Sequence, residues 1–124
     1  MTPRRDNLPT RRAKAIDGLA VVGGAGTASL FRDTARAESE PLVVRFAALR
    51  GLGQLTEPEA ITAELGPFLA SANDSRVRAF AGEVLIRRVG LTACPTVRAQ
   101  VSSEADATRG HFGRALAYCD GQRP

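Results

Sequence analysis

The sequence is short of the residues from which most catalytic and metal sites are built. It contains no Trp, a single His (His111) and two Cys among its 124 residues. With one His, no Ser/His/Asp or Cys/His arrangement can be argued, and neither Cys has a Cys or His neighbour at the spacing of metal ligands. We therefore predict no catalytic residue, no metal and no cofactor.

The two cysteines, Cys94 and Cys119, have two interpretations. Two are too few for a disulfide framework, which favours reduced thiols in the core. In the helical arrangement predicted below, however, Cys94 opens one helix and Cys119 closes the antiparallel helix that follows. The alternative is therefore a disulfide bridge between them.

Aromatic residues are also scarce, at 5% of the chain, whereas Ala, Val and Leu are abundant. Small and straight-chain apolar residues suit closely packed helices better than β-sandwiches, which depend on β-branched and aromatic side chains. The length allows one domain with a core of its own. Composition therefore favours a single all-α domain.

No apolar stretch is long enough to span a bilayer. Residues 19–31 are mildly apolar, follow Arg11-Arg12 and precede small residues at 35–37, which is the order of parts in a twin-arginine export signal. Asp17 stands before the apolar stretch and three glycines dilute it, which makes this export signal poor. We predict a cytoplasmic protein without membrane contact, with export as the alternative.

Positive charge is in excess. The formal net charge is +4, and Lys14 is the only Lys, so nearly all basic side chains are Arg. A basic balance permits binding to nucleic acid or to an acidic protein. The alternative is a solvated surface on which the charges are scattered, and composition leaves both interpretations open.

A repeat runs through the chain. An Arg is followed by Ala three positions later and by Leu four positions after that, and the pattern returns twice at a constant spacing of 33 residues. The three copies are Arg12, Ala15, Leu19; Arg45, Ala48, Leu52; and Arg78, Ala81, Leu85. A fourth, weaker copy is Arg109, Phe112, Leu116. A fixed period in so short a chain indicates a repeat architecture.

Apolar residues in and between the copies follow helical spacing, and turn residues separate them. Thr56-Glu57-Pro58-Glu59 is typical of a capping box, and Asp74 is placed to cap the helix that carries Arg78. The predicted helices cover residues 9–22, 27–37, 40–53, 57–70, 75–89, 95–103 and 106–119. We predict one domain over 9–119, with tails at 1–8 and 120–124.

Short loops make neighbouring helices antiparallel, so the helices pair as hairpins. One hairpin buries too little surface to fold alone, whereas stacked hairpins form a continuous core. The predicted fold is therefore a short α-solenoid of about seven helices. We expect Ala15, Ala48 and Ala81 to be buried where helices approach closely.

The repeated helix resembles HEAT and HEAT-like repeats, including the short form of phycobilisome-lyase-type proteins. That family's second helix typically reads Asp-x-x-Val-Arg-x-x-Ala-x-x-x-Leu. The full match is Asp74, Val77, Arg78, Ala81, Leu85, and Val44, Arg45, Ala48, Leu52 match without the Asp. The resemblance implies a curved scaffold whose second helices line a concave, partner-facing side.

The recurring Arg has a structural and a functional interpretation. In the first, each of Arg12, Arg45 and Arg78 bonds a loop carboxylate or carbonyl and ties one repeat to the next, with Asp74 as a candidate partner. In the second, the three form a ladder of cations on the concave face, suited to bidentate pairing with carboxylate or phosphate. Further arginines that could widen such a basic surface are Arg50, Arg76, Arg87, Arg88 and Arg114.

Residues 21–27 carry three glycines and resemble a strand that enters a glycine-rich phosphate-binding turn. No second strand with a closing acid follows at the right distance, and the preceding segment keeps the helical register. A helix C-cap followed by a turn is the favoured interpretation.

Taken together, these features predict a non-catalytic scaffold or adaptor that binds another protein. One alternative is a nucleic-acid-associated protein that binds phosphates through its Arg residues, and a second is a lyase-type accessory that holds a small ligand. Self-association through the terminal helices is a further hypothesis. It arises because Ile16, Leu19 and Val22 have no predicted helix before them.

Overall fold

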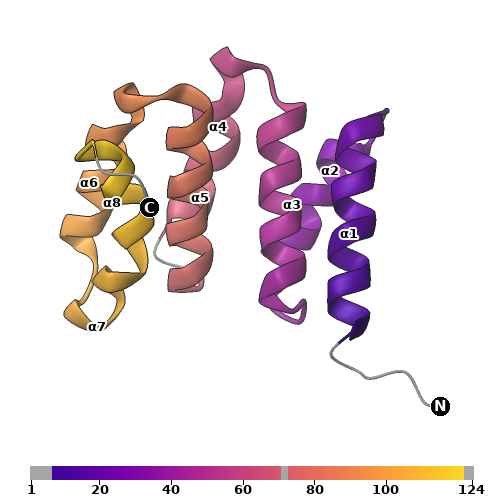
Figure 1. Cartoon of the computed structure of the whole chain (residues 1–124), viewed down its shortest axis with the longest axis horizontal. Coiled ribbons are helices and arrows are strands. Elements are labelled where there is room, and N and C mark those ends of the chain that lie inside the picture. The colour runs from indigo at the N-terminus through magenta and orange to yellow at the C-terminus, as the bar shows by residue number, and fades with distance from the viewer. Residues whose placement is uncertain (1–6, 71–72, 122–124) are drawn as a thin grey trace. The chain divides into compact units, whose positions relative to one another are not determined.

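The computed structural model describes residues 7–70 and 73–121, and all regular structure within these ranges is helical (Figure 1). The all-α prediction is confirmed. The chain divides into two compact units, and the boundary between them in the sequence falls between Thr56 and Glu57. The single predicted domain over 9–119 thus contains two groupings of contacts. The predicted tails, 1–8 and 120–124, lie mostly outside the described residues.

Unit 1 consists of α1 (Asn7–Val22), α2 (Thr27–Arg36) and α3 (Leu42–Leu55). Helix α3 packs against both of the others, and Figure 1 shows α1 and α3 side by side with α2 behind them. Two mid-helix positions explain how closely α2 and α3 approach. Phe31 is fully buried, and a Cβ added to Gly51 would lie 2.6 Å from Cδ2 of its ring. Only a glycine leaves room for the ring there.

The glycine-rich segment between α1 and α2 is a turn. Val21 and Val22 form the last residues of α1, and the amide of Gly23 donates to the carbonyl of Leu19 at 2.8 Å. Gly23, Gly24 and Gly26 have φ values of 72°, 122° and 81°, which side chains disfavour. The C-cap interpretation is confirmed, and the strand of a dinucleotide-binding motif is wrong.

Unit 2 begins with η1 (Pro58–Ala60), α4 (Ile61–Leu65) and η2 (Gly66–Leu69), which together fill the predicted helix at 57–70. Proline lacks an amide hydrogen, and Pro58 and Pro67 stand in the first turns of the two 3₁₀ segments. The capping box predicted at Thr56 is wrong, because Thr56 closes α3 and no side chain caps η1.

Helix α5 (Ser75–Val89) is the centre of unit 2. It packs against α4 and η2 on one side and against η4 and α8 on another. The later elements are η3 (Leu91–Ala93), α6 (Cys94–Ser103), α7 (Asp106–Arg109), η4 (Gly110–Phe112) and α8 (Gly113–Cys119). Because α5 is surrounded in this way, it buries residues on most of its circumference.

A disulfide joins Cys94, the first residue of α6, to Cys119, the last residue of α8, with the two Cα atoms 5.8 Å apart. The prediction of reduced thiols is therefore wrong. The alternative is confirmed for the reason given: α6 and α8 pack together, and the opening of one helix lies beside the end of the other.

The repeat predicts burial correctly in two of its three strong copies. Ala48 and Leu52 in α3 and Ala81 and Leu85 in α5 are fully buried. The expectation for Ala15 is wrong, because that residue is exposed. Helix α1 instead buries Ala13, Ile16 and Ala20, which lie on another side of the helix.

Candidate functional site

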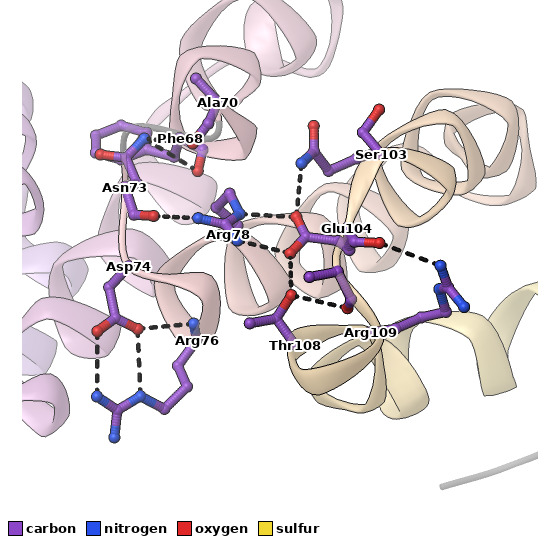
Figure 2. Close-up of polar contacts among 12 residues, drawn as sticks. Phe68, Ala70, Asn73, Asp74, Arg76, Arg78, Ser103, Glu104, Thr108 and Arg109 are labelled. Carbon is purple, nitrogen blue, oxygen red and sulfur yellow. Dashed lines mark hydrogen bonds and ion pairs between the residues drawn. The ribbon is translucent and has the colours of Figure 1, made fainter.

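Arg78 and Glu104 form the most deeply buried ion pair among the described residues. Nε of Arg78 donates to Oε2 of Glu104 at 2.8 Å, and Nη2 donates to Oε1 at 2.6 Å (Figure 2). Nη1 of Arg78 donates to the backbone carbonyl of Asn73. The side chain of Glu104 is only 1% exposed. One planar guanidinium therefore joins α5, the loop before it and the junction between α6 and α7.

Glu104 collects further donors from both helices beside it. Gln100 donates to Oε2 at 2.6 Å, and the hydroxyl of Thr108 donates to Oε1 at 2.7 Å. Nη2 of Arg109 donates to the backbone carbonyl of Glu104 at 3.1 Å. The hydrogen bond from Arg78 is the main reason that the pKa of Glu104 falls to about 2, and it also raises the pKa of Arg78. Glu104 thus accepts side-chain hydrogen bonds from α5, α6 and α7.

Sequence reasoning missed Glu104 because its role depends on tertiary contacts. It lies 26 residues after Arg78 and outside the repeated motif. Asp74, the predicted partner, accepts from the backbone amide of Arg76 and so caps α5, and it also pairs with the Arg76 side chain at 3.1 Å. The charge of Asp74 makes a smaller contribution to the raised pKa of Arg78.

Arg45 occupies the equivalent place in unit 1 and is also buried, with 4% of its surface exposed. Its Nε donates to the backbone carbonyl of Ala35, near the end of α2, at 2.8 Å. Arg12, the first member of the repeat, is more exposed and pairs with Glu40 in the loop before α3. Each of the three recurring Arg residues thus contacts a carboxylate or a carbonyl of its own unit.

A second column of charges recurs five positions after the repeated Arg. Arg50 donates to both carboxylate oxygens of Asp17 at 3.2 Å. In unit 2 the equivalent residue is Glu83, a buried acid that pairs with Arg114 at 2.9 Å and with Arg87 at 3.7 Å. Both equivalent positions form an ion pair, but Arg50 is the cation of its pair whereas Glu83 is the anion.

The predicted cation ladder is therefore only partly at the surface. Arg45 and Arg78 are buried, Arg12 and Arg50 are engaged in ion pairs, and Arg87 and Arg88 are exposed near the end of α5. The contacts of Arg45 and Arg78 hold helices together within a unit. Arg87 and Arg88 are consecutive residues of α5, and Arg87 pairs with Glu83.

A hollow opens on the surface of each unit. In unit 2, a hollow of about 320 Å³ is lined by Gly66, Leu69, Ala70, Thr96, Ala99, Gln100 and Ser103. In unit 1, a hollow of about 230 Å³ between α1 and α2 is lined by Arg12, Ala15, Ile16, Leu30 and Thr34. Neither contains a cluster of ionisable groups, and the described residues hold no group of three metal-ligating side chains.

Large apolar side chains are exposed mainly in unit 1. In the part of the chain that is described, seven large hydrophobic residues are exposed, and five of them belong to α1 and α2: Leu8, Leu19, Val21, Val22 and Leu30. Of these five residues, Leu30 lines the hollow of unit 1. This apolar surface is the feature that sequence reasoning foresaw at Leu19 and Val22 but located wrongly at Ile16, which is buried.

Comparison with known proteins adds no family and no activity. No protein-family model matches the sequence, and neither the curated proteins nor the solved structures include one similar to it. Within the described ranges, every helix is too short or too polar to cross a bilayer. Function therefore has to be inferred from the side chains described above.

Proposed function

We propose that this chain is a non-catalytic scaffold that binds another protein and is built of HEAT-like helical repeats. The observation that carries the proposal is the equivalence of α3 and α5. Helix α3 buries eight residues, and seven of the positions 33 residues later are buried in α5. The shared roles extend to polar positions, since Arg45 and Arg78 are both buried. Such matched burial is what a repeat architecture requires.

The same equivalence supports stacking of the two units as successive repeats of an α-solenoid. Small-angle X-ray scattering tests this part of the proposal, because a rigid stack gives one fixed set of intramolecular distances. A scattering profile that requires two units moving independently would contradict the solenoid.

The apolar surface of α1 and α2 favours a protein partner over a nucleic acid. Phosphate binding needs accessible cations, yet Arg45 and Arg78 are 4% and 9% exposed. Exposed apolar patches are instead typical of protein interaction sites. A duplex-DNA titration at two salt concentrations tests the alternative, and tight binding that weakens steeply with salt would favour it.

Affinity purification from the native host tests the scaffold proposal itself. The tagged chain is incubated with extract treated with nuclease, and retained proteins are identified and quantified. We expect one protein retained in a fixed ratio that survives washing with 0.5 M salt, on the order of the concentrations that screen surface charge. Retention of nucleic acid alone in untreated extract, or of nothing in either extract, would contradict the proposal.

The disulfide bears on the predicted cytoplasmic location. Stable disulfides persist in oxidising compartments and are rare in the cytosol. Alkylation of intact host cells before lysis separates the two cases. If Cys94 and Cys119 are alkylated without prior reduction, the cytoplasmic prediction stands; if both are protected, the protein resides in an oxidising compartment.

A further inference from the structure

Helix α8 is attached to the rest of unit 2 by little buried surface. It spans seven residues, Gly113–Cys119, and Ala115 is the one residue in it that is buried. A methyl group removes little apolar area from water, and a helix this short is marginal without tertiary contacts. Just before α8, the ring of Phe112 is fully buried and anchors η4 beside α5. The residues after Phe112 therefore depend on other ties.

Two ion pairs of the described residues tie this segment to its neighbours, and both are near the surface. Arg114 pairs with Glu83 of α5, but the Arg114 side chain is 66% exposed. Asp120, which follows α8, pairs with Arg98 of α6 at 2.9 Å, and both of these side chains are about half exposed. Exposed ion pairs contribute little to stability. Neither pair therefore holds α8 firmly.

The disulfide is a covalent tie at the opposite end of α8 from Phe112. It joins Cys119, the last residue of α8, to Cys94, the first residue of α6. While the bond is intact, α8 is fixed at both ends. When the bond is broken, the Phe112 end stays anchored, and Ala115 and the two exposed ion pairs are left to hold the rest of the helix.

The two cysteines differ in exposure and in helix position. Cys94 is 7% exposed, whereas Cys119 is half-buried, so a thiolate from solvent reaches Cys119 more readily. Attack on Cys119 expels Cys94 as a thiolate at the start of α6, where the positive end of the helix dipole favours negative charge. Thiol–disulfide exchange is faster when the leaving thiolate is stabilised. The arrangement therefore favours reduction of the folded chain.

We propose that the Cys94–Cys119 disulfide is a redox latch, which a dithiol reductant opens to release α8 while the rest of unit 2 stays folded. A thiolate of the dithiol bonds to Sγ of Cys119, and the electron pair of the Sγ–Sγ bond goes to Sγ of Cys94. The second thiolate of the dithiol then displaces Sγ of Cys119 and closes a cyclic disulfide. Two electrons and two protons pass from the dithiol to the two cysteines.

Release of α8 uncovers one side of α5. Glu83 and Ile86 are three positions apart on that side and are 5% and 3% exposed. Arg114 leaves Glu83 together with α8, but Arg87, on α5 itself, also pairs with Glu83. A buried carboxylate that loses its partner is costly. Because Glu83 keeps Arg87, this cost does not prevent α8 from opening.

Tyr118 reports on α8 alone, because it is the only Tyr of the chain and there is no Trp. It is half-buried, one residue before Cys119. The purified full chain is reduced with dithiothreitol, alkylation of a parallel sample verifies complete reduction, and acrylamide quenching of the tyrosine fluorescence is measured. We expect the quenching constant to rise at least about twofold, and hydrogen exchange to accelerate at least about tenfold in α8 and less in α5. Reoxidation with glutathione disulfide should restore both.

Two variants serve as controls. Cys94→Ser/Cys119→Ser holds the latch open, so its quenching constant should match that of the reduced chain and should not respond to dithiothreitol. Arg98→Gln removes the ion pair with Asp120 but keeps the disulfide, so its quenching constant should stay within about 20% of the oxidised chain. Far-UV circular dichroism of all samples measures the remaining helix.

The route of reduction separates a latch from a structural disulfide. Ile61 is fully buried in α4, which packs against α5, so Ile61→Ala destabilises unit 2 from outside α8. If dithiothreitol attacks the folded chain, this variant should change the rate of reduction less than about twofold. If reduction requires unfolding, the rate should rise at least about tenfold.

Three results would overturn the proposal. The first is a tenfold faster reduction of Ile61→Ala, and the second is Tyr118 quenching that full reduction leaves unchanged. The third is loss of helical circular dichroism across the chain on reduction, because release would then not be confined to α8. None of these measurements needs a bound partner, so they test the latch independently of the scaffold function.

Discussion

Helices α3 and α5 both bury an arginine, but the groups that accept its hydrogen bonds differ. Each is the central helix of its unit, and each has a buried Arg as its fourth residue. Arg45 donates to a neutral backbone carbonyl of the preceding helix, whereas Arg78 is held by a carboxylate that comes from later in the chain. Position in the repeat therefore determines that the Arg is buried. The neighbouring elements determine whether a carbonyl or a carboxylate accepts its hydrogen bonds.

The difference matters energetically. A buried cation without compensation is costly, and a buried ion pair is held in place because removing one partner strands the other. In unit 2 this ion pair depends on Glu104, whose carboxylate accepts hydrogen bonds from α5, α6 and α7. The disulfide joins α6 to α8 in the same unit. Unit 1 relies instead on close backbone approach, as at Gly51 and Phe31.

The largest expected effect follows from removing each Arg. Arg78→Met should lower the free energy of unfolding by about 3–5 kcal/mol, because Glu104 is left buried without a cation. Arg45→Met should cost only about 1–3 kcal/mol, because a carbonyl loses its donor. Urea unfolding at pH 7 measures both, and equal costs would remove the distinction between the two helices.

The double variant Arg78→Met/Glu104→Leu is the control for this interpretation. Replacing both partners by apolar side chains removes the stranded charge, so much of the lost stability should return. A double variant less stable than Arg78→Met would mean that Gln100 and Thr108, not the charge, make Glu104 important.

Loss of the disulfide should have the next largest effect and should act on unit 2. Cys94 and Cys119 are 25 residues apart, and closing a loop of that length is worth about 3.5 kcal/mol in the chain-entropy model. Hydrogen exchange of Cys94→Ala/Cys119→Ala should show faster opening of α5, α6 and α8 and unchanged exchange in α1–α3. Equal acceleration in both units would mean that they do not open separately.

Acid should weaken unit 2 through Glu104. The pKa of Glu104 falls from 4.5 to about 2 in the folded chain, so the carboxylate stabilises the fold above about pH 4.5. As the pH falls from 4.5 towards 2, a contribution of about 3 kcal/mol should disappear. Glu104→Gln should flatten this dependence, while Arg45→Met should leave it intact, since Arg45 bonds a carbonyl that does not titrate. A pH profile unchanged by Glu104→Gln would refute the assignment.

Sequence reasoning predicted the helices well because their signals are local. Apolar spacing and turn residues place the helical segments other than η3 (Leu91–Ala93), and the glycines at 23, 24 and 26 mark the turn between α1 and α2. The spacing of 33 residues also predicts the burial of Ala48 and Ala81. These features depend on the order of residues along one helix.

The failures all concern contacts between elements. Ala15 has the same sequence context as Ala48, but no described helix covers it. Glu104 has no motif of its own, and its partner lies on another helix. The disulfide was only an alternative, since the proximity of two helix ends depends on tertiary packing. A repeat reports which side of a helix is apolar, but it does not report what lies against that side.

Gly51→Ala should destabilise unit 1 by about 1–3 kcal/mol, an ordinary cost of overpacking. The new Cβ would lie 2.6 Å from Cδ2 of Phe31, whose ring is fully buried and cannot move into solvent. Thermal unfolding measures the loss. Phe31→Leu in the same chain should recover part of it by vacating the space, and an additive effect of the two substitutions would show that the ring is not the obstacle.

Gly82→Ala is the counterpart in α5 and should stabilise the protein by about 0.5–1 kcal/mol. A Cβ at Gly82 would meet Leu69 and Val97 at 3.5 Å, which is ordinary van der Waals contact. Alanine also loses less conformational entropy than glycine in a helix interior, so the substitution gains stability where no atom has to move. The same thermal melts compare the two variants directly. Opposite signs at positions 51 and 82 would show that close helix approach is a property of unit 1, whereas a loss at both would mean that α5 is packed as tightly as α3.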